Sequence, residues 1–176
     1  MNRLVITMGD PCGVGPEIIV KFFDGIYKVE DKRLFLVVVG SKSVLEYYKK
    51  KLRIDLEIVE ITKAHIVDGK LENGKLHLIN IDTDIDKLEF GKHTELGGAL
   101  SIKYLDKAIE LCHGKYVDGI VTCPISKDSI NMAGFKYSGH TEYLAEKSKT
   151  EDFAMVLKGK KVVVLLNSTH VSLKEA

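Results

Sequence analysis

Long apolar runs are the feature that most restricts how this chain can fold. Residues 34–39 (LFLVVV) are apolar at every position, so a strand formed there would bury both of its faces. Such strands are typical of a parallel sheet with helices on either side. Shorter runs of similar character occupy residues 4–7, 117–122 and 162–166. The sequence therefore predicts an α/β fold built on a parallel sheet of buried strands.

Helical patterns lie between the predicted strands. Apolar residues recur at the spacing of one helix face between residues 102 and 112, and Gly114 is expected to end that helix. Gly40 and Ser41 predict another helix start directly after the second strand. Strands that alternate with helices in this way favour parallel pairing.

One segment departs from this alternation. Residues 56–61 and 76–81 are amphipathic, and Asn73–Gly74 ahead of the second run is a typical hairpin turn. We therefore expect an antiparallel excursion that pairs Ile66–Val67 with residues 76–81. A polar connecting loop is expected over residues 82–93.

Charge and cysteine content narrow the classes of protein that fit. The 176 residues carry 26 Lys and Arg against 25 Asp and Glu, and a net charge of +1 argues against a nucleic-acid or acidic-membrane partner. The three cysteines are scattered and odd in number, which favours a reducing compartment over a disulfide framework. No apolar run reaches the length of a signal segment or a membrane span. We expect a cytoplasmic protein with no membrane partner.

The last residues predict an element that is cut short. Ser172 and Glu175 form a capping box, which starts a helix, yet the sequence stops at Ala176 within the first turn. A single turn cannot pack an apolar face against a sheet. We interpret the sequence as a piece of a longer protein, with a naturally frayed terminus as the alternative.

The first candidate site follows the first predicted strand. Residues 8–18 (MGDPCGVGPEI) open a helix with Pro16 at its first position, and Gly13 and Gly15 allow a neighbouring part of the chain or a ligand to approach the backbone. Free N–H groups at the helix start would suit an anion. The glycine spacing matches neither a dinucleotide fingerprint nor a P-loop, so a tight turn without a ligand is an equal alternative.

The second candidate site follows the strand predicted at residues 117–122. Ligands of open α/β sheets bind beyond the carboxyl ends of strands, and Lys127 would lie there. Its amine could hold a phosphate or carboxylate, or transfer a proton if it were desolvated. Ser126 followed by Lys127 is also the pattern of a plain helix cap beside a solvated lysine. From the residues alone that plain interpretation is favoured.

Two histidines lie next to predicted helix starts. Thr141 is expected to cap a helix over residues 142–149, which places a neutral His140 just ahead of it. His170 follows residues 162–166 and precedes the helix predicted at the chain end. Neutral imidazoles are frequent metal ligands, but two of them do not complete a site. The remaining histidines are interpreted as surface or structural residues: His65, His77, His93 and His113.

Four segments, in order along the chain, resemble the 4-hydroxythreonine-4-phosphate dehydrogenase family. They are residues 6–18 (ITMGDPCGVGPEI), 118–127 (DGIVTCPISK), 135–146 (FKYSGHTEYLAE) and 168–173 (STHVSL). The resemblance extends over almost the whole chain but over only the first half of the family's length. Cys12 and Cys123 stand where the family usually has small residues, a mild change because cysteine packs as a small hydrophobe.

The resemblance implies a fold and a set of site residues. The fold would be an isocitrate/isopropylmalate-dehydrogenase-like α/β/α sandwich in two lobes, present as its N-terminal half. Residues 1–122 would lie in the first lobe, and 123–176 would begin the second. His140 and Thr141 would bind substrate, and His170 would be one of three histidine ligands of a divalent metal (zinc, magnesium or cobalt).

The resemblance also implies an activity and an assembly. The activity would be metal-dependent oxidation of 4-phosphohydroxy-L-threonine by NAD or NADP, then decarboxylation to 3-amino-2-oxopropyl phosphate, in pyridoxal phosphate biosynthesis. The enzyme would be a homodimer, and the cofactor-binding residues are unassigned. The catalytic candidate, Lys127, comes from its place after the predicted strand and not from the resemblance. Alternatives are a sister dehydrogenase acting on erythronate or threonate 4-phosphate, a non-catalytic metal- or phosphate-binding module, and an inert fragment.

Overall fold

The structure is a computed structural model that describes residues 2–25, 34–69, 71–72, 74–166, 172 and 174. The chain divides into two compact units, Met1–Tyr137 and Ser138–Ala176. The first unit holds a five-stranded sheet, and the second holds a helix and a two-stranded hairpin.

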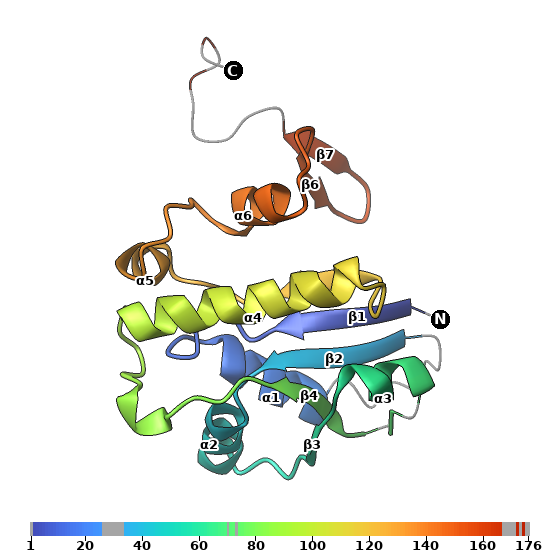
Figure 1. The fold of residues 1–176 in the computed structure, drawn as a ribbon, viewed down its shortest axis with the longest axis vertical. Helices are drawn as coiled ribbons and strands as arrows, with labels where there is room; N and C mark the ends of the chain where they lie inside the picture. The colour runs from blue at the N-terminus through green and yellow to red at the C-terminus, as the bar shows by residue number, and fades with distance from the viewer. Residues whose placement is uncertain are drawn as a thin grey trace. The chain divides into compact units, whose positions relative to one another are not determined.

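A parallel sheet forms the centre of the first unit (Figure 1). Its strands lie in the order β3-β4-β2-β1-β5, and every pairing between neighbours is parallel. Their bounds are β1 Asn2–Thr7, β2 Leu34–Gly40, β3 Ile58–Glu60, β4 Leu76–Asn80 and β5 Gly119–Thr122. The predicted α/β fold on a parallel sheet is confirmed.

Helices cover both faces of this sheet. α4 (Glu95–His113) lies on one face, and α1 (Gly15–Gly25) and α2 (Lys42–Leu52) lie on the other (Figure 1). α3 (Lys63–Asp68) connects β3 to β4, and α5 (Lys127–Met132) packs against α4. Because the helices cover the faces of the sheet, loops surround the carboxyl ends of the strands.

Local sequence explains the elements that shape the site. The Thr94 hydroxyl caps α4 by accepting the main-chain N–H of Gly97 at 3.0 Å. α5 lies close to α4 because Gly98 has no side chain: a Cβ there would meet the carbonyl oxygen of Ser129 at 1.9 Å. Ser41 and Gly114 occupy the helix ends predicted for them.

The expected antiparallel excursion around Asn73–Gly74 is wrong. Ile66 and Val67 belong to α3, and β4 pairs in parallel with both β2 and β3. α3 makes the crossover that a parallel connection requires, and it ends at Gly69 with a φ of 64°. Asn73 itself lies outside the described residues.

The polar segment at residues 82–93 is a loop, as predicted, with one 3₁₀ turn, η1 (Ile85–Lys87). The capping box predicted for Ser172 and Glu175 cannot be compared, because Glu175 lies outside the described residues.

The second unit begins with α6 (His140–Lys147) and continues into β6 (Met155–Lys158) and β7 (Val163–Leu166). The strand predicted at residues 162–166 therefore forms, but it pairs antiparallel with β6 and is not buried in a parallel sheet. A two-stranded hairpin has few neighbours, so its side chains stay exposed. Leu165, for example, is 66% exposed.

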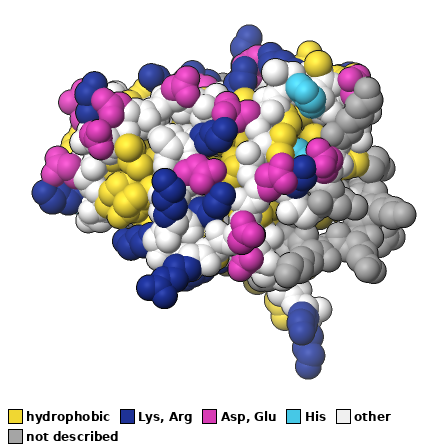
Figure 2. Space-filling model, turned by 90° about the horizontal axis from the view of Figure 1, so that it is seen from below, with side chains coloured by type: hydrophobic (Ala, Val, Ile, Leu, Met, Phe, Trp, Pro, Cys, Tyr) yellow, Lys and Arg dark blue, Asp and Glu magenta, His cyan; other side chains and the backbone are white. Residues whose placement is uncertain are grey.

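The surface carries mixed charge on the face drawn in Figure 2, where Lys and Arg side chains are interspersed with Asp and Glu. Ion pairs at the surface include Lys42 with Glu60 and Lys75 with Glu57, each at 2.8 Å. Among the described residues, no helix combines the length and apolarity needed to cross a membrane.

Candidate functional site

A crevice opens at the carboxyl ends of β1 and β5. β1 has β2 on one side and β5 on the other, and the helices that follow β1 and β5 lie on different faces of the sheet. Ligands of open α/β sheets bind at such a point, where the loops diverge. The crevice has a volume of about 220 Å³ and is lined from three segments, residues 10–14, 91–93 and 124–126.

Asp10 ties two walls of the crevice together. Its main-chain N–H donates to the carbonyl oxygen of Pro124 at 3.0 Å. Its buried carboxylate accepts the main-chain N–H of Cys12 and the hydroxyl of Ser129, each at 2.9 Å. Gly9 permits this approach, because it has a φ of 72° and a Cβ there would lie 2.2 Å from the Pro124 oxygen.

Of the two approaches that the sequence allows at Gly15, to a neighbouring part of the chain or to a ligand, the structure shows the first. A Cβ at Gly15 would lie 2.0 Å from the carbonyl oxygen of Met8, whereas one at Gly13 would meet its nearest neighbour only at 3.4 Å. Of the two glycines singled out in the sequence, Gly13 is therefore the one with room, and it lines the crevice.

The thiols beside the crevice are poor nucleophiles. Burial raises the pKa of the Cys12 thiol, and it raises the pKa of Cys123 to about 11. Both thiols are therefore protonated at neutral pH, whereas the thiolate is the reactive form. Cysteine-based covalent catalysis is disfavoured here.

His93 adds a polar rim that sequence reasoning missed. Its Nδ1 lies 2.7 Å from the Ser126 hydroxyl, and its Nε2 lies 4.0 Å from a carboxylate oxygen of Asp128. The imidazole is exposed, as expected of a surface histidine, yet it lines the crevice. It reaches Ser126 from the loop before α4, 33 positions away, and no local pattern relates two such residues.

Lys127 is the first residue of α5 and directly follows the crevice wall. The predicted cap is confirmed, because the Ser126 hydroxyl accepts the main-chain N–H of Ser129 at 3.1 Å. Lys127 is exposed, and no ion pair engages it within the described part of the chain. A solvated amine fits anion binding better than proton transfer. The catalytic role of Lys127 stays a prediction.

His140 and Thr141 begin α6 in the second unit. The N-cap is Gly139, so the expectation that Thr141 caps this helix is wrong. Glu142 takes that role instead: hydrogen bonds from the Ser138 hydroxyl and from main-chain N–H groups, including that of Gly139, lower the pKa of its carboxyl. A carboxylate in the first turn reaches back to the N-cap more readily than a hydroxyl at the second position.

The His140 ring is suited to contact with a ligand. Its Nε2 atom is buried and has no hydrogen-bond partner among the described residues. Burial lowers the pKa of His140, so the imidazole is neutral at neutral pH, as expected. Substrate binding by His140 and Thr141 stays a prediction. Lys127 is grouped with His93 and Ser126 in the first unit, whereas His140 and Thr141 belong to the second.

The described residues do not complete a metal site. Among them, no group of three or more His, Cys, Asp or Glu side chains could hold an ion. The predicted ligand His170 lies outside the described residues. The donors that the structure describes therefore do not fit a metal by themselves.

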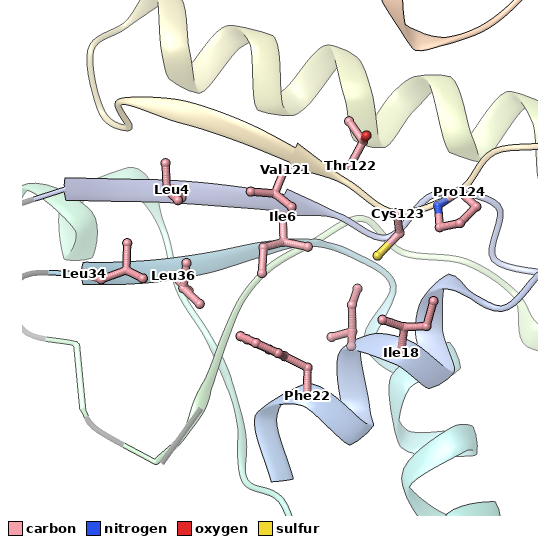
Figure 3. Close-up of a pocket in the computed structure, with 11 residues that line it drawn as sticks. Leu4, Ile6, Ile18, Phe22, Leu34, Leu36, Val121, Thr122, Cys123 and Pro124 are labelled. Carbon is pink, nitrogen blue, oxygen red and sulfur yellow. The ribbon is translucent and has the colours of Figure 1, made fainter. Parts of the chain in front are cut away.

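A larger hollow, of about 400 Å³, lies on the sheet face that carries α1 (Figure 3). Its lining is almost entirely apolar, with Ile6 of β1, Phe22 of α1 and Val121 of β5 around it. Binding sites for reacting molecules also need a few convergent polar groups, which this hollow lacks. We therefore place the candidate site at the smaller crevice.

Comparison with known proteins identifies relatives along the whole chain. The family model "Pyridoxal phosphate biosynthetic protein PdxA" matches residues 32–176. The 4-hydroxythreonine-4-phosphate dehydrogenase of Sulfurihydrogenibium sp. is 41% identical over 99% of this chain and 52% of its own length. A Fusobacterium nucleatum protein named "Putative D-threonate 4-phosphate dehydrogenase" is 37% identical, again over 99% of this chain and 52% of its own length.

Solved structures agree with the sequence relatives. The 4-hydroxythreonine-4-phosphate dehydrogenase of Klebsiella pneumoniae superimposes with a TM-score of 0.85 at 30% identity, covering 99% of this chain and 52% of that one. This chain thus spans about half the length of the relatives it matches. With a family model matched over residues 32–176 and the fold shared, the chain belongs to the pyridoxal phosphate biosynthetic protein PdxA family.

Proposed function

We propose that this chain is the N-terminal half of a dehydrogenase that oxidises a small phosphorylated hydroxy acid with NAD or NADP. Membership in the PdxA family carries the proposal, because the relatives matched over nearly the whole chain are named as dehydrogenases of such acids. The crevice at the carboxyl ends of β1 and β5, with Lys127 beside it, supports it.

The favoured substrate is 4-phosphohydroxy-L-threonine, for which the 41% identical relative is named. Oxidation of its C3 hydroxyl gives a β-keto acid, which loses carbon dioxide to form 3-amino-2-oxopropyl phosphate. The alternative is D-threonate 4-phosphate, named for the 37% identical relative, or the related erythronate. The threonate substrates keep the phosphate and replace the amine with a hydroxyl.

The described side chains supply binding and orientation. Lys127 holds the phosphate through charge-assisted hydrogen bonds, and the neutral His140 and the Thr141 hydroxyl hold polar groups of the substrate. The bound nicotinamide supplies the hydride acceptor. At about 220 Å³, the crevice is smaller than the usual site for a whole ligand, so it holds one part of the bound molecules.

Metal dependence and dimer formation belong to the same proposal. His170 would supply one imidazole, and the other ligands would come from the part of the relatives' length that this chain does not cover. In a protein of the relatives' length, His170→Ala should lower metal content and kcat together. His140→Ala should mainly raise KM and leave the metal bound. Wild-type metal content and kinetics in both variants would contradict these roles.

The direct test is turnover by a protein of the relatives' length that contains this chain. Reduced nicotinamide should form with 4-phosphohydroxy-L-threonine at a higher kcat/KM than with D-threonate 4-phosphate. The reverse order would move the assignment to the sister enzyme. Binding of metal and phosphate with no nicotinamide reduction would instead favour a non-catalytic module.

A further inference from the structure

The proposed reaction assigns no role to the buried carboxylate of Asp10. Asp10 is only 5% exposed, and within the described residues no Lys, Arg or His forms an ion pair with it. Burying a carboxylate is costly unless hydrogen bonds compensate, and those to a charged acceptor are strong. The two bonds from Cys12 and Ser129, each at 2.9 Å, provide that compensation.

These bonds join segments that are distant in the sequence. Ser129 lies on α5, 119 positions from Asp10. The third segment is α4. A Cβ on Gly97 of this helix would lie 2.7 Å from Oδ1 of Asp10, so the carboxylate packs directly against α4. The loop after β1, α4 and α5 therefore meet at one carboxylate.

α5 depends on such contacts for its place. It has six residues, and a helix this short is not stable on its own. Ser129 is a fully buried residue of α5 that contacts the Asp10 carboxylate, whereas Lys127, two residues earlier, is exposed beside the crevice. Fixing Ser129 therefore fixes the turn from which Lys127 projects.

We propose that Asp10 is a positioning residue that, through Ser129, holds Lys127 in place at the crevice for the phosphate of the substrate. The inference rests on the proposed function. Both carboxylate oxygens already accept protein hydrogen bonds, which suits positioning and leaves proton transfer to other groups.

A double-mutant cycle tests the link in a protein of the relatives' length. Lys127→Ala, Ser129→Ala and the double variant are compared by kcat/KM on the phosphorylated substrate. Ser129→Ala should lower kcat/KM by up to about tenfold, mainly through KM, because it removes a charge-assisted hydrogen bond. In the Lys127→Ala background it should cost little more, since the group it positions is absent.

Two further variants separate the positioning of Lys127 from a nonspecific disruption of the packing around α4 and α5. Ser101→Ala is the matched control: Ser101 is 1% exposed and donates to the carbonyl oxygen of Gly97 at 2.7 Å, but it makes no bond to α5. Its effect should be the same with and without Lys127. Asp10→Asn should be milder than Ser129→Ala, because its amide can still accept from Cys12 and donate to the Ser129 hydroxyl.

The outcomes distinguish this inference from the proposed function. Lys127→Ala could lower kcat/KM strongly while Ser129→Ala lowers it by the same factor with and without Lys127. That result would overturn the positioning role alone. No loss with Lys127→Ala would contradict phosphate binding by Lys127, and the positioning role would fall with it.

Discussion

β2 and β7 are almost alike in sequence and opposite in environment. β2 reads LFLVVVG and β7 reads VVLL, yet Val37, Val38 and Val39 are 0% exposed whereas Val163 is 63% exposed. β2 lies between β1 and β4 with helices on both faces, whereas within the described part of the chain β7 pairs with β6 alone. Apolar sequence therefore specifies a strand, while burial depends on what else packs there.

The largest expected difference between the two regions is in the stability lost when a leucine is truncated to alanine. Leu78 on β4 is 0% exposed and Leu165 on β7 is 66% exposed. In the 176-residue chain, Leu78→Ala should lower the free energy of unfolding by about 2–5 kcal/mol, because it leaves a cavity. Leu165→Ala should change it by less than about 0.5 kcal/mol. Urea unfolding measures both, and equal losses would show that β7 is buried in solution.

A smaller difference in stability is expected between alanine substitutions at two glycines. Gly98→Ala forces a Cβ against the Ser129 carbonyl and should destabilise the first unit by about 1–3 kcal/mol. Gly25 ends α1, and no atom of the described residues lies within 4 Å of a Cβ built there, so Gly25→Ala should stabilise by about 0.4–1 kcal/mol. If both variants gained stability, the close α4–α5 contact would be wrong.

The smallest expected effect is the pH dependence of stability that arises from His77. Nε2 of His77 on β4 accepts the main-chain N–H of Glu72 at 3.1 Å, and burial lowers the pKa of His77 from 6.5. The unfolded chain therefore takes up this proton first as the pH falls. Stability should be full above about pH 6.5, decline below it, and level off once the folded-state pKa is passed.

His77→Gln checks this pH dependence, because glutamine keeps an acceptor but does not titrate. Urea unfolding at several pH values should show a shallower decline than in the wild type. Some decline should remain, since burial lowers the pKa of His140 in the same direction. An unchanged profile would mean that His77 does not stay neutral in the folded chain.

Much of the sheet could be predicted from sequence, because residues 34–39 are apolar on both faces and α4 has a regular apolar face. The hairpin at Asn73–Gly74 was predicted wrongly, because its turn signal is local and α3 has only six residues in which to show a helical pattern. The exposure of β7 was missed because an apolar run does not specify its neighbours.

Sequence singled out two of the segments that line the crevice, residues 8–18 and the residues just before Lys127, but not the contacts that join them. Ser126 and Lys127 adjoin a strand end, so their place as cap and first helical residue followed from sequence. His93 and Asp10 join the site through contacts to Ser126 and Ser129, which the folded chain alone brings near.

The most direct test of the account is the recognition of phosphate by Lys127. In a protein of the relatives' length, kcat/KM is measured for the wild type and Lys127→Ala on the phosphorylated hydroxy acid and on its dephosphorylated analogue. We expect the variant to lose about tenfold or more on the phosphorylated compound and much less on the analogue, because a charge-assisted contact to phosphate is removed. An equal loss on both compounds would contradict the account and place Lys127 in chemistry or folding.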